Sequence, residues 1–109
     1  MLENIKIGIS VGDLNGIGLE VIVKSFKKFK TPKSCTLILF GQKKLCDIYL
    51  KNIKNSIQLN LISNINDAVN NKLNIINAKN NNATLELGKK SILSGLNSYN
   101  SLKLASSYL

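Results

Sequence analysis

The stretch ISVGDLNGIGLE, residues 9–20, joins two apolar segments through three glycines, and it decides the fold class. Before this stretch, apolar residues alternate with polar or small ones from Ile5 to Val11, which predicts a strand. After it, apolar residues recur at helical spacing from Leu19 to Phe29, which predicts a helix that ends at Thr31–Pro32. A strand, a glycine-rich turn and a helix in this order open a parallel α/β sheet.

The rest of the chain continues this alternation. CTLILFG, residues 35–41, is short, apolar and closed by glycine, as expected of a strand buried on both faces. A short helix is predicted over 42–51, and weaker strands over 57–61 and 73–76. The second of these lies in a stretch, 64–82, where nine of nineteen residues are asparagine. Because asparagine favours turns and loops, this stretch is interpreted as a surface excursion.

The tail from Gly88 onward predicts a helix. Its apolar residues form one wide stripe: Ile92, Leu96, Tyr99, Leu102, Ala105 and Leu109. Three or four strands and three helices make a small parallel sheet that needs cover on both faces. We therefore predict an α/β fold that is incomplete, and we expect the isolated chain to self-associate through uncovered helix and sheet surfaces.

Composition excludes several function classes. The net charge of +9 comes entirely from 15 lysines, because the chain has no arginine. Asparagine, lysine and isoleucine are all abundant and have AT-rich codons, so an AT-rich genome explains this balance without a nucleic-acid partner. The missing arginine also argues against nucleic-acid recognition. With no membrane-length apolar run and no signal-peptide pattern at the start, a soluble cytoplasmic protein is expected.

The absence of histidine restricts the chemistry further. A histidine general base, a Ser–His pair and an imidazole metal site are all excluded within this chain. Cys35 and Cys46 have neither zinc-site spacing nor ligand partners, so they are interpreted as free core thiols. We predict no catalytic residue and no metal ligand in these 109 residues.

The glycine-rich turn has two interpretations. At the carboxyl end of a parallel strand, such a turn lets backbone N–H groups approach an anion beside a helix N-terminus. The spacing of Gly16 and Gly18 nevertheless matches neither the dinucleotide fingerprint nor a Walker loop. A purely structural turn therefore stays open beside a ligand-binding loop, and Asn15 could be only a helix cap.

The residues KIGISVGDLNGIGLEVIVKSF, 6–26, resemble the opening of the 4-hydroxythreonine-4-phosphate dehydrogenase family, which reads G-D-P-A-G-I-G-P-E after a strand. The residues of this chain that match are Gly12, Asp13, Gly16, Ile17, Gly18 and Glu20. A weaker match is LELGKKSILSGLNSYNSLKLA, 85–105, which resembles a later helix of the family. Leu14 and Leu19 stand where the family has proline, and their presence should loosen the loop.

The resemblance implies an incomplete parallel-sheet domain of the isocitrate/isopropylmalate dehydrogenase-like fold, with residues 1–109 as the N-terminal portion of one α/β domain and the rest of a two-domain subunit absent. It implies NAD-dependent oxidation and then decarboxylation of 4-phosphooxy-threonine in pyridoxal phosphate biosynthesis. It also implies a homodimer and a divalent metal (zinc, magnesium or cobalt), whose ligands lie outside this chain.

On that resemblance, the cofactor-binding candidates are Gly12, Asp13, Asn15, Gly16 and Gly18. The glycines would allow backbone approach, and the two polar side chains would make contacts at the strand end. The 109-residue chain alone is expected to be inactive. The alternatives are a degenerate gene product, a non-catalytic basic α/β interaction module that binds an acidic partner, and a small anion-binding protein.

Overall fold

The computed structural model describes residues 5–12, 15–28, 34–78 and 92–109. They form an α/β fold around one four-stranded sheet in which every pair of neighbouring strands is parallel. This confirms the predicted fold class. The strands lie in the order β1-β2-β4-β3, with the bounds β1 (Ile5–Ser10), β2 (Cys35–Gly41), β4 (Asn74–Asn77) and β3 (Asn60–Leu61).

The interior position of β2 explains its apolar run. It pairs with β1 from Ile5 opposite Cys35 to Ser10 opposite Phe40, and it pairs with β4 on its other side. Alternate side chains then enter two separate cores, because successive residues of a strand point to opposite faces. Leu39 belongs to one core, and Phe40 belongs to the other. The predicted strand buried on both faces is confirmed.

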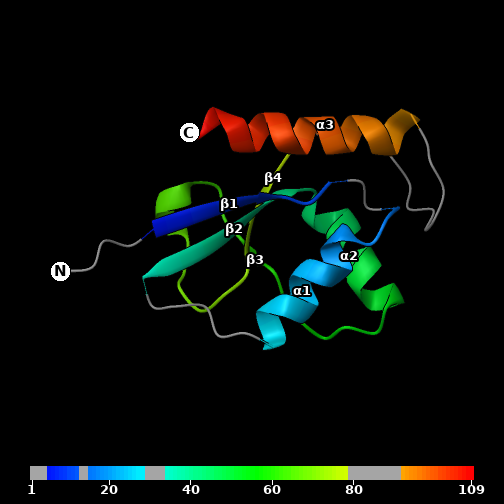
Figure 1. Cartoon of the computed structure of the whole chain (residues 1–109), viewed down its shortest axis with the longest axis horizontal. Coiled ribbons are helices and arrows are strands. Elements are labelled where there is room, and N and C mark those ends of the chain that lie inside the picture. Colours follow the sequence, from blue (N-terminus) through cyan, green and yellow to red (C-terminus); the bar gives the residue numbers. More distant parts are fainter. Residues whose placement is uncertain (1–4, 13–14, 29–33, 79–91) are drawn as a thin grey trace.

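Helices cover the two faces unequally (Figure 1). Helices α1 (Gly18–Lys28) and α2 (Lys43–Asn52) lie on one face, and α3 (Ile92–Ser107) lies on the other. The larger core lies under α1 and α2 and includes Leu19, Val23, Leu39, Cys46, Tyr49 and Ile75. The smaller core, under α3, consists of Ile38, Phe40, Ile62 and Ile76. Helices α1 and α2 each bury one apolar face, as the periodicity predicts.

The asparagine-dense stretch corrects one expectation. It contains the short 3₁₀ helix η1 (Ile65–Asp67), and it also contains β4, an inner strand of the sheet. The weak strand predicted over 73–76 is therefore confirmed, but Asn74, Ile75 and Ile76 are all buried, so the interpretation of this part as a surface excursion is wrong. The predicted strand at 57–61 is also shorter than expected, because only Asn60 and Leu61 pair with β4.

Helix α3 forms as predicted, but much of the predicted apolar stripe is exposed. Tyr99 and Leu102 are 60% and 58% exposed, whereas Ser101 is fully buried. Leu104 and Ala105 provide the apolar contact with the smaller core. The helix is therefore oriented by a buried serine and not by its largest side chains.

Candidate functional site

The candidate site starts where β1 ends and the chain turns towards α1. Gly12 has a positive φ of 71°, in the left-handed region that favours glycine. A Cβ built on Gly12 would have no atom within 4 Å, so there is space for a side chain at this position. The requirement for glycine here is therefore conformational and not steric. Asp13 and Leu14 follow directly and lie outside the described residues, so the structure does not place the predicted Asp13 contact.

The second half of the loop presents its main chain to solvent. Gly16, Ile17 and Gly18 are all exposed, and Gly18 is the first residue of α1. The amino end of an 11-residue helix carries unpaired N–H groups and a partial positive charge. Glu20 lies in the first turn, where its charge suits that dipole, and it forms an ion pair with Lys24 at 2.8 Å. The loop is thus open at the carboxyl edge of the sheet.

Two inward contacts hold the loop. Asn15 is only 4% exposed, so most of its surface packs within the fold and little is left for a ligand. The Tyr49 hydroxyl of α2 donates a hydrogen bond to the Gly16 carbonyl at 3.3 Å. Burial, and then the Glu20 carboxylate, raise the pKa of Tyr49 above its ordinary value, so its hydroxyl stays protonated and able to donate. Helix α2 therefore positions the exposed glycines.

The neighbouring strand ends meet the loop at the same edge. The Val11 N–H donates to the Phe40 carbonyl at 3.2 Å, and the Ala78 N–H donates to the Gly41 carbonyl at 2.7 Å. One step further, the Asn77 side chain accepts a hydrogen bond from the Lys43 N–H at 2.9 Å. This contact satisfies a free donor at the start of α2. The end of β4 thus caps the helix that follows β2.

Ser101 of α3 ties the opposite face to this edge. Its hydroxyl donates to the Phe40 carbonyl and accepts from the Val11 N–H at 3.2 Å. Because the proton of Ser101 is used in this way, Ser10 is the donor in the hydroxyl pair at 3.0 Å. A buried serine with three partners satisfies its polar atoms completely. It also fixes the strand end one residue before Gly12.

Of the predicted candidates, the structure brings Gly12, Asn15, Gly16 and Gly18 together in one turn. Sequence reasoning missed three residues that shape this turn: Tyr49, Asn77 and Ser101. Tyr49 carried a signal as an apolar helix residue, but its hydroxyl partner lies 33 positions away in the chain. A serine in a helix and an asparagine among many asparagines carried no signal.

The chemistry available from this part of the chain is main-chain recognition of an anion. The described residues contain no group of three His, Cys, Asp or Glu side chains that could hold a metal ion. Both cysteines are free, and burial raises the pKa of Cys46 to about 12, so its thiol is not a nucleophile at neutral pH. Within the described ranges, no helix has the length and apolar character needed to cross a membrane.

Comparisons with known proteins identify what this chain resembles. No family model matches it. A curated 4-hydroxythreonine-4-phosphate dehydrogenase from Bacteroides thetaiotaomicron is 32% identical over 90 residues. The match covers 82% of this chain but only 25% of the relative, so the chain spans about a quarter of the curated relative's length. The resemblance seen in the glycine-rich stretch is therefore confirmed, over part of that enzyme only.

Solved structures agree on the fold. A candidate 4-hydroxythreonine-4-phosphate dehydrogenase from Salmonella typhimurium has a TM-score of 0.77 at 24% identity, over 96% of this chain and 33% of that one. A 4-hydroxythreonine-4-phosphate dehydrogenase from Burkholderia phymatum has a TM-score of 0.70 at 23% identity, over 94% and 32%. In sequence this chain is similar to a quarter of one such dehydrogenase, and in fold to a third of two others.

Proposed function

We propose that this chain supplies the opening strand, loop and helix of a 4-hydroxythreonine-4-phosphate dehydrogenase. The enzyme would oxidise 4-phosphooxy-threonine with NAD and then decarboxylate the product, in cytoplasmic pyridoxine and pyridoxal phosphate biosynthesis. The observation that carries this proposal is the 32% identity that extends over 82% of the chain. The open loop at the carboxyl edge of the sheet supports it, because ligands of open α/β sheets bind at that edge.

In this proposal the loop contributes main-chain atoms and not acid–base groups. The exposed backbone of Gly16 and Gly18 at the start of α1 suits an anionic group, such as a phosphate of NAD or of the substrate. Bound NAD would supply the hydride acceptor. Gly12 would keep the backbone turned away from the strand end, and Asp13 would add a polar contact beside it. The buried Asn15 would stabilise the loop from inside the fold and would contact the ligand less than the exposed glycines do.

The metal that the resemblance implies does not fit the described residues. They hold no cluster of potential ligands, and histidine is absent from the whole chain. Any divalent metal of the assembled enzyme would therefore be held elsewhere. On the same resemblance we place the chain in a homodimer that acts on a small phosphorylated substrate. The 109-residue chain alone would then form no NADH.

A chimera tests the function directly. Residues 1–109 would replace the matching quarter of the Bacteroides thetaiotaomicron dehydrogenase, and NADH formation from 4-phosphooxy-threonine would be followed by absorbance. We expect the chimera to be active and the isolated chain to be inactive. A G12V substitution in the chimera should lower kcat/KM at least about tenfold, because a β-branched residue is strained at positive φ.

K44Q, an exposed change on α2, is the matched control and should leave kcat/KM unchanged. Circular dichroism would show whether each chimera is folded. A folded chimera that forms no NADH would refute the proposal and favour the non-catalytic interaction module. Full activity of G12V would instead show that the turn is only structural.

A further inference from the structure

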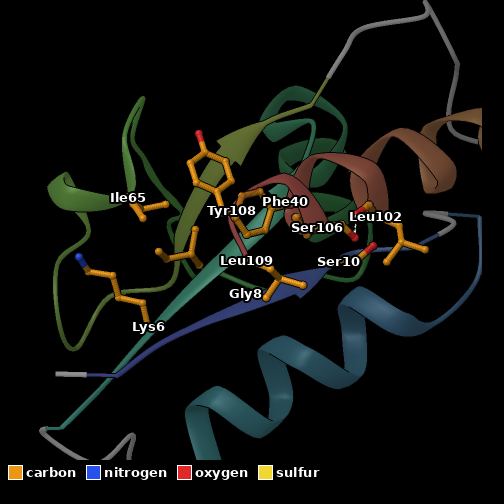
Figure 2. Close-up of a pocket in the computed structure, with 11 residues that line it drawn as sticks. Lys6, Gly8, Ser10, Phe40, Ile65, Leu102, Ser106, Tyr108 and Leu109 are labelled. Atoms are coloured by element: carbon orange, nitrogen blue, oxygen red, sulfur yellow. Dashed lines mark hydrogen bonds between the residues drawn. The ribbon is translucent and has the colours of Figure 1, made fainter. Parts of the chain in front are cut away.

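A second concave site lies on the α3 face of the sheet and has no part in the proposed dehydrogenase chemistry. It is a pocket of about 280 Å³ between β1 and the C-terminal end of α3. Gly8, Ile38 and Phe40 form its floor, and Leu102, Ala105 and Leu109 form its opposite wall (Figure 2). We propose that this pocket binds a small amphipathic carboxylate, with the apolar body between sheet and helix and the carboxylate at Lys6.

Small residues on both walls create the space. A Cβ built on Gly8 would lie 2.9 Å from the Phe40 ring, so the ring lies directly against the bare backbone of β1. Gly8 remains exposed although α3 covers this face further along, and Ala105 on the helix adds little volume. The Phe40 ring also packs against the Tyr108 ring, with ring centroids 5.5 Å apart. The absence of a side chain at Gly8 thus leaves room for a ligand beside Phe40.

The lining carries one charged side chain. It belongs to Lys6, and every other residue that lines the pocket has an uncharged side chain. Among the described residues, Lys6 has a neutral hydrogen-bond partner, Asn66 at 3.4 Å, and no carboxylate within ion-pair distance. Asn66 lies beside Ile65, which lines the same end of the pocket. An ammonium group at the mouth of an apolar pocket selects an anion with an apolar body.

The two serine hydroxyl groups that line the pocket have partners within the protein. Ser10 hydrogen-bonds to Ser101 at 3.0 Å, and Ser106 donates to the Leu102 carbonyl at 2.9 Å. They therefore offer little to a strongly polar ligand such as a sugar. The pocket volume is just below the usual range for small-molecule sites of about 300–1,000 Å³, so the ligand has to be small. A medium-chain carboxylate meets both conditions.

Titration of the full chain with octanoate tests the site. Calorimetry should give a dissociation constant of about 1 mM or tighter for a ligand of this size. Amide shifts in ¹⁵N-labelled protein should centre on Gly8, Ser10 and Ser106, and not on Gly16 and Gly18. Octanol has the same apolar body without the charge and should bind at least about fivefold more weakly. Octylammonium and acetate should not bind.

Two variants separate charge from shape. K6Q, at an exposed position, should weaken octanoate binding about five- to tenfold and leave octanol binding unchanged. A105F should fill the pocket and abolish binding of both. K103Q, an exposed lysine of α3 outside the pocket, is the matched control and should bind as the wild type does. Equal binding of octanoate and octanol, shifts that centre elsewhere, or undiminished binding by K6Q would each overturn the proposal.

Discussion

At the residue scale, Asn74 shows how one polar side chain can organise a sheet. It is completely buried in β4, an unusual position for asparagine. Its Nδ2 donates to the carbonyls of Leu37 and Val69, both at 2.9 Å, and of Lys72 at 3.1 Å. Its Oδ1 accepts from the Asn60 side chain at 2.9 Å and from the Val69 N–H at 3.0 Å. One amide thus joins β2, β4, β3 and the turn before β4.

Replacing this amide should be costly. We expect N74A to lower the free energy of unfolding by about 2–4 kcal/mol, because it leaves several buried backbone groups without partners. N52A, an exposed position at the end of α2, should change it by less than about 0.5 kcal/mol. Urea denaturation followed by circular dichroism measures both. Equal stability of the two variants would show that the Asn74 network contributes little.

At the element scale, the contact between the ends of β1 and β2 sets the geometry of the loop. Gly41 closes β2 beside Val11, and a Cβ at Gly41 would lie 2.4 Å from the Val11 Cγ2. No rotation of a side chain at Gly41 relieves this overlap, because the Cβ position is fixed by the backbone. The glycine that closes the apolar run therefore makes room for the residue before Gly12. The run itself predicted the strand but not this contact.

A double-mutant cycle tests that contact. G41A should lower the free energy of unfolding by about 1–3 kcal/mol through overpacking. V11A removes the two methyl groups that cause the overlap, so G41A in the V11A background should cost less than about 1 kcal/mol. Thermal or urea unfolding of the four proteins gives the coupling. Additive effects of the two substitutions would contradict the close approach.

At the scale of the whole molecule, exposed apolar side chains gather along α3. Leu96, Tyr99 and Leu102 follow one another at helical spacing and are 42–60% exposed. Lys103 is the only charged residue of this helix, so most of the net charge of +9 is carried elsewhere and does not protect these side chains. A continuous apolar patch of this kind favours association. Strand β1, at an edge of the sheet, exposes Ile5 and Ile7 on the opposite face.

We therefore expect the isolated chain to self-associate at micromolar concentration. The double variant L96E/Y99E should shift the protein towards monomer in sedimentation velocity experiments, because it places two charges in the contact. V21E, a similar change at an exposed apolar residue of α1, is the control and should leave association as in the wild type. A wild-type protein that stays monomeric would refute the expectation. An equal effect of V21E would show that net charge and not α3 is responsible.

Local pattern was enough to determine much of this protein. Alternation in β1, helical spacing in α1 and the apolar run of β2 each depend on neighbours in the chain, and all three elements form where they were predicted. The position of the glycine-rich turn was predicted correctly for the same reason, because the positive φ that favours glycine at Gly12 is a property of the local backbone. Whether that turn binds a cofactor stays a prediction.

Only the tertiary structure decided what depends on distant partners. The sequence predicted a weak strand over 73–76, but it did not indicate that Asn74 would be buried there or that Ser101 would be a fully buried residue of α3. An asparagine is buried or exposed according to whether backbone groups from other strands reach it, and here they do. Helix α3 is oriented by the bonds that Ser101 forms with the ends of β1 and β2. Such hydrogen bonds join residues tens of positions apart, so no local period of the sequence contains them.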